Sequence, residues 1–224
     1  MDGRSFQEKL EEALRESLSF SGYSKQSENP AVQNSLRSSY FCYKVVEKLS
    51  DTPDLNGFCP KTIKVDKEGV KTAGEWLLDA VWCKGSKVWQ AESKRIFPTF
   101  IRAALECESD TSERDFFIDF AKLTHIRSDI KIFLGGVNQK SRDNLLKYIE
   151  KRREQAGKFI TECRENLEST EWFLAFWPSP GKLKNSQYNS LWDELGKRSD
   201  DTSHLSSIYA YKLRGNFFEE IRED

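Results

Sequence analysis

Two short apolar segments separated by a long amphipathic stretch constrain the fold of this chain more than any other feature. Residues 129–137 (DIKIFLGGV) and 171–177 (EWFLAFW) have the length and composition of buried strands. Between them, Ser141 is placed to cap a helix whose inner face carries Leu145 and Ile149. Strands that alternate with amphipathic helices are typical of α/β domains.

The rest of the chain continues this alternation. Apolar spacing predicts helices over about residues 5–22, 30–49, 99–106, 112–126 and 192–198, and further strands over 61–65, 75–82, 87–94 and 206–214. We therefore expect an α/β fold with a mixed central β-sheet flanked by helices. Residues 1–55 are expected to form an N-terminal helical segment packed on an α/β core of residues 56–224, as one structural unit.

Charge and hydrophobicity argue against a membrane-spanning or secreted protein, and they give no global sign of a nucleic-acid partner. Lys and Arg number 35 against 36 Asp and Glu, so no global basic field indicates a nucleic-acid partner, although local patches can exist within a neutral total. No apolar run approaches the roughly 20 residues that span a bilayer. The acidic, amphipathic start of the chain is unlike a signal peptide. These features predict a cytoplasmic protein without a membrane segment.

Cysteine and histidine give no recognisable site. The five cysteines are odd in number, scattered and without a CxxC pair, which argues against a disulfide framework or a structural zinc site. His125 and His204 lie far apart, and neither forms a nucleophilic constellation with a cysteine or serine.

The segment GEWLLDAVWCKGSKVWQAESKR (residues 74–95) carries charged residues that an ordinary core hairpin would avoid. Asp79 interrupts the apolar run LLDAVW. If two strands turn at Gly85, alternation places Asp79 near Glu92 on one face, with Lys94 just beyond. Two carboxylates at one point repel each other unless a positive charge lies between them, and a divalent cation supplies that charge. The alternative is a solvated sheet face.

Magnesium suits such a pair because it needs few protein carboxylates and takes waters and phosphate oxygens as its other ligands. The ion can polarise a phosphodiester, and a neighbouring lysine can orient the attacking water or help to deprotonate it. This geometry predicts metal-assisted hydrolysis of a phosphodiester, with Asp79 and Glu92 as metal ligands.

The same segment resembles the PD-(D/E)XK nuclease superfamily, in which a strand carrying an acidic residue is followed by a strand carrying E-x-K. Bacterial members of this group have a Glu-Trp-Leu opening before the aspartate, an E-S-acidic triplet at the end of the next strand, and an Asp-Phe-x-Lys-Leu helix. Here these features read EWLLD, ESK and DFAKL. Leu78 stands in place of the proline of the signature. The resemblance implies a restriction-endonuclease-like core and catalytic roles for Asp79, Glu92 and Lys94, with Glu75 as an auxiliary residue.

The resemblance also implies partners and a biological setting. It indicates a Mg²⁺-dependent endonuclease that cuts DNA in restriction, phage defence or repair, with Mn²⁺ as a substitute ion and with RNA left open as a substrate. A homodimer or a partner protein is expected. Polar residues around the hairpin are the predicted nucleic-acid contacts, and those after it add to this surface: Lys84, Lys87, Gln90, Arg95, Lys122, Arg127 and Lys131.

Two other functions stay open at this stage. A catalytically silent nuclease fold could serve as a nucleic-acid-binding or protein-interaction subunit, a role that fits the near-neutral charge. A structural α/β protein with solvated carboxylates is the second. The separation of the Asp79 and Glu92 carboxylates, together with a cleavage assay, discriminates among the three.

Overall fold

A computed structural model of the chain describes residues 1–20, 29–62, 64–66, 69–71, 78–85, 98–139, 141–163, 170–179 and 207–221. Its helices are α1 (Gly3–Ser19), α3 (Pro30–Ser50), α5 (Glu113–Thr124) and α6 (Arg142–Glu162). Its strands are β1 (Cys59–Thr62), β2 (Lys64–Asp66), β3 (Gly69–Lys71), β4 (Ala80–Gly85), β5 (Pro98–Glu108), β6 (Ile130–Val137), β7 (Glu171–Pro178), β8 (Tyr209–Arg214) and β9 (Phe217–Glu220).

Seven of these strands form one mixed sheet in the order β1-β4-β5-β6-β7-β8-β9. The first three pair antiparallel, β5, β6 and β7 pair parallel, and the last three pair antiparallel again. Strands β2 and β3 form a separate two-stranded ribbon. The predicted α/β fold with a mixed central sheet is thus confirmed.

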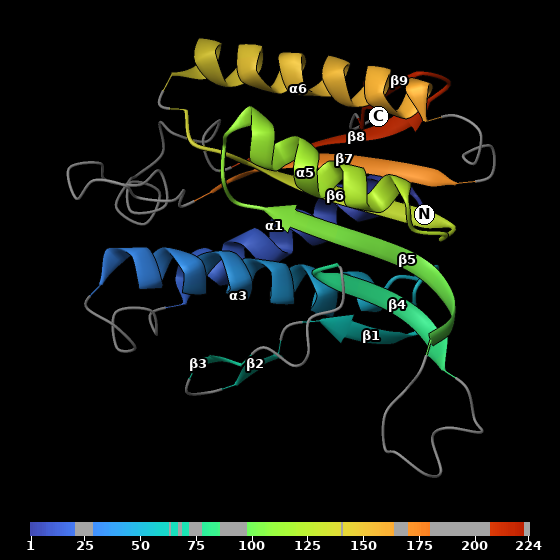
Figure 1. Ribbon diagram of the computed structural model, residues 1–224. Helices are drawn as coiled ribbons and strands as arrows, with labels where there is room; N and C mark the ends of the chain where they lie inside the picture. The colour runs from blue at the N-terminus through green and yellow to red at the C-terminus, as the bar shows by residue number, and fades with distance from the viewer. Residues whose placement is uncertain are drawn as a thin grey trace.

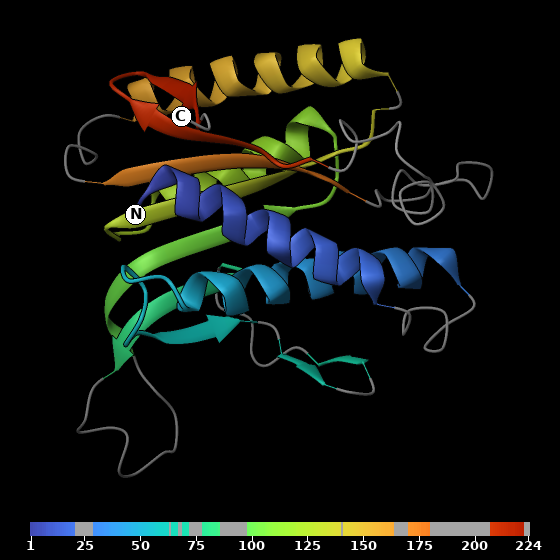
Figure 2. The ribbon, with the colours of Figure 1, turned by 180° about the vertical axis from the view of Figure 1, so that it is seen from behind.

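Helices cover both faces of the sheet (Figures 1 and 2). On one face α1 and α3 pack against the central strands, with the Phe6 ring 4.7 Å from that of Phe173 and the Phe41 ring 4.3 Å from that of Trp177. On the other face lie α5 and α6, where the Phe116 ring is 4.7 Å from that of Phe133. Burial on both faces explains why the central strands are largely apolar rather than alternating.

The N-terminal helical segment therefore contributes directly to the core of the sheet. Helix α1 begins at Gly3, and Asp2 is its N-cap, because the Asp2 side chain accepts a hydrogen bond from the backbone N–H of Ser5. The proposed division of the chain at residue 55 stays a prediction. None of the helices in the described residues is long and apolar enough to cross a membrane.

One element was predicted wrongly. Residues 99–106 were expected to be helical, but they belong to the long strand β5. Ala103 and Leu105 contact the α1–α3 side of the core, whereas Ala104 contacts the α5–α6 side. Alanine and leucine favour helices locally, yet pairing with β4 and β6 in the centre of the sheet overrides that preference.

Two predicted elements cannot be compared with the structure. The strand over 87–94 and the helix over 192–198 lie outside the described residues. The strand predicted over 75–82 is described only from Leu78, and β4 begins at Ala80, so that Asp79 immediately precedes it.

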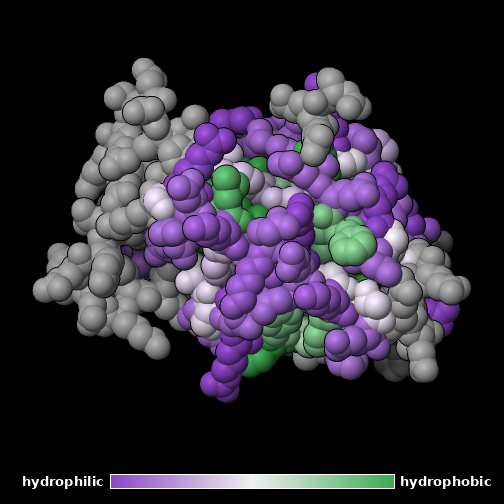
Figure 3. Space-filling model, turned by 90° about the horizontal axis from the view of Figure 1, so that it is seen from above, coloured by the Kyte–Doolittle hydropathy of each residue, from purple (hydrophilic) through white to green (hydrophobic). Residues whose placement is uncertain are grey.

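The outer face of α6 is largely hydrophilic when the molecule is seen from above (Figure 3). Along α6 the buried residues include Leu145, Ile149, Ala156 and Ile160, which recur at helical spacing. The apolar face that the sequence predicts for α6 is therefore the face that packs against the sheet.

Ser112 determines where α5 begins. Its hydroxyl oxygen accepts a hydrogen bond of 3.1 Å from the backbone N–H of Asp115. We expect Ser112→Ala to lower the free energy of unfolding by about 1 kcal/mol, because a helix N–H loses its partner. Ser112→Thr keeps the capping oxygen and is the matched control. Equal stability of the two variants in urea denaturation would contradict this role.

Candidate active site

The antiparallel pairing of β4 and β5 brings two carboxyl groups together. Ala80 pairs with Leu105, so Asp79 lies beside the end of β5. Its Oδ2 accepts a hydrogen bond of 2.8 Å from the backbone N–H of Cys107. The carboxyl group of Glu106 lies beside the Asp79 side chain, so that the two can share a proton. Glu106 is only 2% exposed and Asp79 is partly buried, so Glu106 in particular is withdrawn from bulk water.

Helix α5 adds a cation to this pair. The Lys122 Nζ lies 3.5 Å from Oε1 of Glu106 and 2.5 Å from Oδ1 of Asp119. Phe116, Phe120 and Leu123 anchor α5 to the sheet, and this packing fixes the position of Lys122 above β5. Asp79, Glu106, Asp119 and Lys122, which we call the carboxylate–lysine cluster, thus come from β5, α5 and the residue before β4.

Burial raises the pKa values of the Asp79 and Glu106 carboxyl groups. Burial, and next the negative charge of Asp79, raise the pKa of Glu106 to about 9. Burial also raises the pKa of Asp79, although the Cys107 N–H opposes this shift. Without a bound cation, the pair therefore retains a proton near neutral pH.

Lys122 remains a cation. Burial alone would lower its pKa, but the hydrogen bond with Asp119 and the charge of Glu106 raise it overall. Its ammonium can donate hydrogen bonds to a water or to a phosphate oxygen, whereas it is a poor general base. Asp119 holds this ammonium in place.

Two carboxyl groups of the cluster could act as ligands of a divalent cation. Oε1 of Glu106 is a buried oxygen that accepts no hydrogen bond, and its nearest charged neighbour is the Lys122 ammonium at 3.5 Å, so this oxygen could still act as a ligand. In the described part of the chain, no group of three or more His, Cys, Asp or Glu side chains is placed to hold a metal. Two carboxylates, completed by waters and substrate oxygens, are nevertheless what Mg²⁺ commonly uses.

The structure places the predicted site residues unevenly. Asp79 lies in the cluster, whereas Lys84 lies toward the other end of β4, where it pairs with Phe100 and sits 5.1 Å from the Phe58 ring centre. Of the contacts predicted after the hairpin, Lys122 lies in the cluster, whereas Arg127 and Lys131 lie near the start of β6. Six further predicted residues fall outside the described residues: Glu75, Lys87, Gln90, Glu92, Lys94 and Arg95. Their roles stay predictions.

Sequence reasoning did not select Glu106, and it treated Lys122 only as a nucleic-acid contact. A signal for both was present. An acidic triplet, Glu106-Cys107-Glu108, ends β5 directly before the helix that contains DFAKL, the order described above for bacterial nucleases. Predicting residues 99–106 as a helix concealed this match.

Comparisons of the chain with protein-family models, with curated proteins and with solved structures found no match. A functional assignment therefore depends on the chemistry of the carboxylate–lysine cluster and on the motif resemblance.

Proposed function

We propose that this protein is a metal-dependent nuclease that hydrolyses phosphodiester bonds of DNA. The observation that carries the proposal is the buried carboxyl group of Glu106 beside Asp79, whose Oε1 accepts no hydrogen bond and lies 3.5 Å from the Lys122 ammonium. Keeping two carboxyl groups together out of water costs stability, and such a cost is typical of functional sites rather than of structural cores.

Each residue of the cluster has a distinct role in this proposal. Asp79 and Glu106 would hold Mg²⁺, or Mn²⁺ in its place, and the ion would supply Lewis-acid stabilisation of the charge that develops on the phosphate. Lys122 orients the attacking water or a phosphate oxygen by donating a hydrogen bond. Asp119 positions Lys122, and the Cys107 N–H fixes the orientation of Asp79.

The arrangement of elements supports a restriction-endonuclease-like core. Three antiparallel strands are followed by a helix and then by a strand parallel to the third. The acidic residues lie at adjacent ends of β4 and β5, in agreement with the superfamily resemblance. Glu108 stands where E-x-K has lysine, and Lys122 from α5 supplies the cation instead.

The remaining features of the proposal derive from the resemblance. They are DNA rather than RNA as the main substrate, a cytoplasmic role in restriction, phage defence or repair, and action as a homodimer or with a partner protein. The alternative is a catalytically silent nuclease fold. It is favoured by the raised pKa of Glu106, because a protonated carboxyl group can remain beside Asp79 without an ion.

Cleavage of supercoiled and linear DNA tests the proposal. We expect the wild-type protein with Mg²⁺ or Mn²⁺ to nick or cut DNA, and EDTA to stop the reaction because the cluster loses its cation. Gel electrophoresis over time provides the measurement. Asp79→Asn, purified identically, controls for contaminating nucleases. A wild-type protein that cuts neither DNA nor RNA with either ion would favour the silent subunit.

A further inference from the structure

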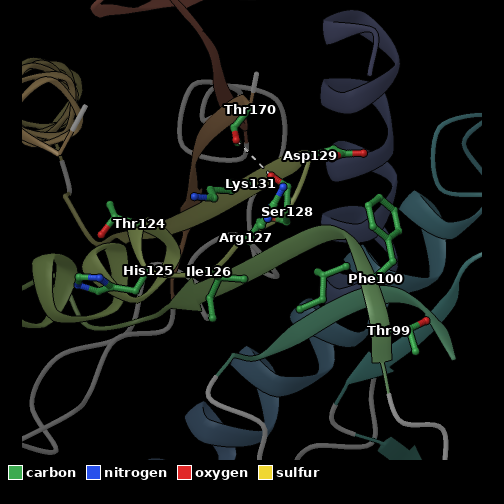
Figure 4. A pocket seen from close by; sticks show the side chains of 11 residues that line it. Thr99, Phe100, Thr124, His125, Ile126, Arg127, Ser128, Asp129, Lys131 and Thr170 are labelled. Atoms are coloured by element: carbon green, nitrogen blue, oxygen red, sulfur yellow. Dashed lines mark hydrogen bonds between the residues drawn. The ribbon is translucent and has the colours of Figure 1, made fainter. Parts of the chain in front are cut away.

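A second polar site lies at the opposite end of α5 from its N-cap. Here a cleft of about 960 Å³ is bounded by the starts of β5 and β6 and by the segment that joins α5 to β6 (Figure 4). Lys131 on β6 pairs with Ala104, whereas Glu106 pairs with Phe133 farther along the same two strands. The cleft is therefore distinct from the carboxylate–lysine cluster.

Lys131 is an unusual residue for a central strand. It is 2% exposed, and its Nζ lies 4.9 Å from the ring centre of Trp172. Within the described part of the chain it has neither a hydrogen bond nor an ion pair with an acidic side chain. Figure 4 shows its side chain extending from β6 toward the end of α5, where Thr124 and His125 lie. An enclosed lysine with no acidic side chain beside it in the described residues is costly unless its charge is balanced, so the position favours an anionic ligand.

The ionisation of Lys131 agrees with this geometry. Burial lowers its pKa to about 8, and only a weak interaction with Cys163 opposes the shift. Among the described residues that line the cleft, the one carboxylate, Asp129, is already paired with Arg102 at 2.6 Å. It therefore does not serve as the counter-ion of Lys131.

The hydroxyl groups of the cleft donate to the backbone rather than to a ligand. Thr124 Oγ1 donates to the carbonyl of Ala121 at 2.7 Å, and Ser128 Oγ donates to that of Ile130 at 3.1 Å. Thr170 Oγ1 donates to the carbonyl of Ser128 at 3.2 Å, as the dashed line in Figure 4 marks. The side-chain donors that remain for a ligand are on nitrogen-bearing groups.

The cationic side chains of the cleft indicate a negatively charged ligand. Lys131 and the exposed Arg127 line the same cleft, and together they carry two positive charges when protonated. A phosphate monoester carries nearly two negative charges at neutral pH, and arginine binds its oxygens in a bidentate manner. A single carboxylate would neutralise only one of the two cations.

The remaining walls suit the body of such a ligand. Phe100, Ile101 and Ile126 add apolar surface beside the charged groups. The volume falls within the range of small-molecule sites, roughly 300–1,000 Å³. We propose that this cleft binds the terminal phosphate of a nucleotide-sized ligand, with Lys131 and Arg127 as its anion contacts. The ligand is either a free nucleotide or the phosphorylated end of a nucleic acid.

Replacing Lys131 by methionine tests this assignment by two readouts. Without ligand we expect Lys131→Met to raise the Tm, because a buried charge without a partner is replaced by an apolar chain of similar length.

With AMP or inorganic phosphate in EDTA, we expect the wild-type Tm to rise by about 2–4 °C. Lys131→Met should weaken AMP binding by roughly 10–100-fold in calorimetric titration, the value of one charge-assisted hydrogen bond. Lys147→Met, at an exposed lysine of α6, is the matched control and should bind as the wild type does.

A second comparison identifies the source of the phosphate. Stronger binding of a 5′-phosphorylated oligonucleotide than of AMP assigns the site to a nucleic-acid end, and the reverse order assigns it to a free nucleotide. Equal binding of phosphorylated and unphosphorylated oligonucleotides would contradict phosphate recognition. So would unchanged AMP affinity in Lys131→Met, or absence of binding by every phosphate probe. Because EDTA is present throughout, these results are independent of whether the carboxylate–lysine cluster cleaves DNA.

Discussion

Glu106→Gln is expected to reduce metal-dependent DNA cleavage by roughly a thousandfold, which corresponds to about 4 kcal/mol of transition-state stabilisation. Glutamine has nearly the same size as glutamate and can still hydrogen-bond to Asp79. It cannot supply the second negative charge that holds a divalent cation. The rate of nicking of supercoiled DNA at saturating Mg²⁺, measured for wild type and variant, gives the ratio directly.

The matched control is the same substitution at the residue that the E-x-K motif selects. Glu92→Gln should leave the cleavage rate within a few-fold of wild type if Glu106 is the second metal ligand. Lys122→Met and Lys94→Met form a parallel pair for the lysine. The opposite result would contradict Glu106 and Lys122 as site residues. In that case the cleavage rate would fall strongly in Glu92→Gln and Lys94→Met but change little in Glu106→Gln and Lys122→Met, which would assign the site to the ESK triplet.

Much of the fold was readable from the sequence because local pattern and tertiary burial agree there. In α6, Leu145, Ile149 and Ile160 recur at helical spacing and all three are buried. The apolar run of β6 is buried along its full length between two layers of helices. Where the burial of a segment follows its own apolar spacing, that spacing predicts the helix or strand correctly.

Strand β5 shows where this correspondence fails. The residues ALE within it favour a helix locally, and nothing in their order specifies pairing with β4 on one side and β6 on the other. Pairing between distant segments depends on the whole sheet, which a local pattern does not contain. Since Glu106 lies in β5, the wrong assignment of that strand also removed Glu106 from the site.

Asp79 and Glu106 differ in how visible they are in the sequence. Asp79 interrupts the apolar run LLDAVW, so its charge stands out. Glu106 follows two alanines and a leucine and precedes further acidic residues, so its charge looks like that of an ordinary surface residue. Only the structure shows that Glu106 is buried beside Asp79 and Lys122.

The stability of the metal-free protein is expected to fall as the pH rises from about 5 to about 8, and Glu106 is the main cause. In the folded protein its pKa is about 9, against an ordinary value of 4.5, so across this range the folded state retains a proton that the unfolded state releases. The contribution of Glu106 to stability is fully present below the pKa of this group in the unfolded chain. It is lost as the pH rises toward the pKa of Glu106 in the folded protein. The raised pKa of Asp79 acts in the same direction.

Urea denaturation in EDTA measures this loss, which we expect to be about 2–4 kcal/mol between the two pH values. Glu106→Gln should flatten the pH dependence and be more stable than wild type at pH 8, because an amide is neutral at every pH. Glu154→Gln, at an exposed glutamate of α6, should retain the wild-type slope. Mg²⁺ should stabilise wild type more at pH 8 than at pH 5, since the ion competes with the proton for Glu106. A pH dependence that survives in Glu106→Gln, together with a Mg²⁺ effect that does not change with pH, would show that this carboxyl group neither holds the proton nor binds the ion.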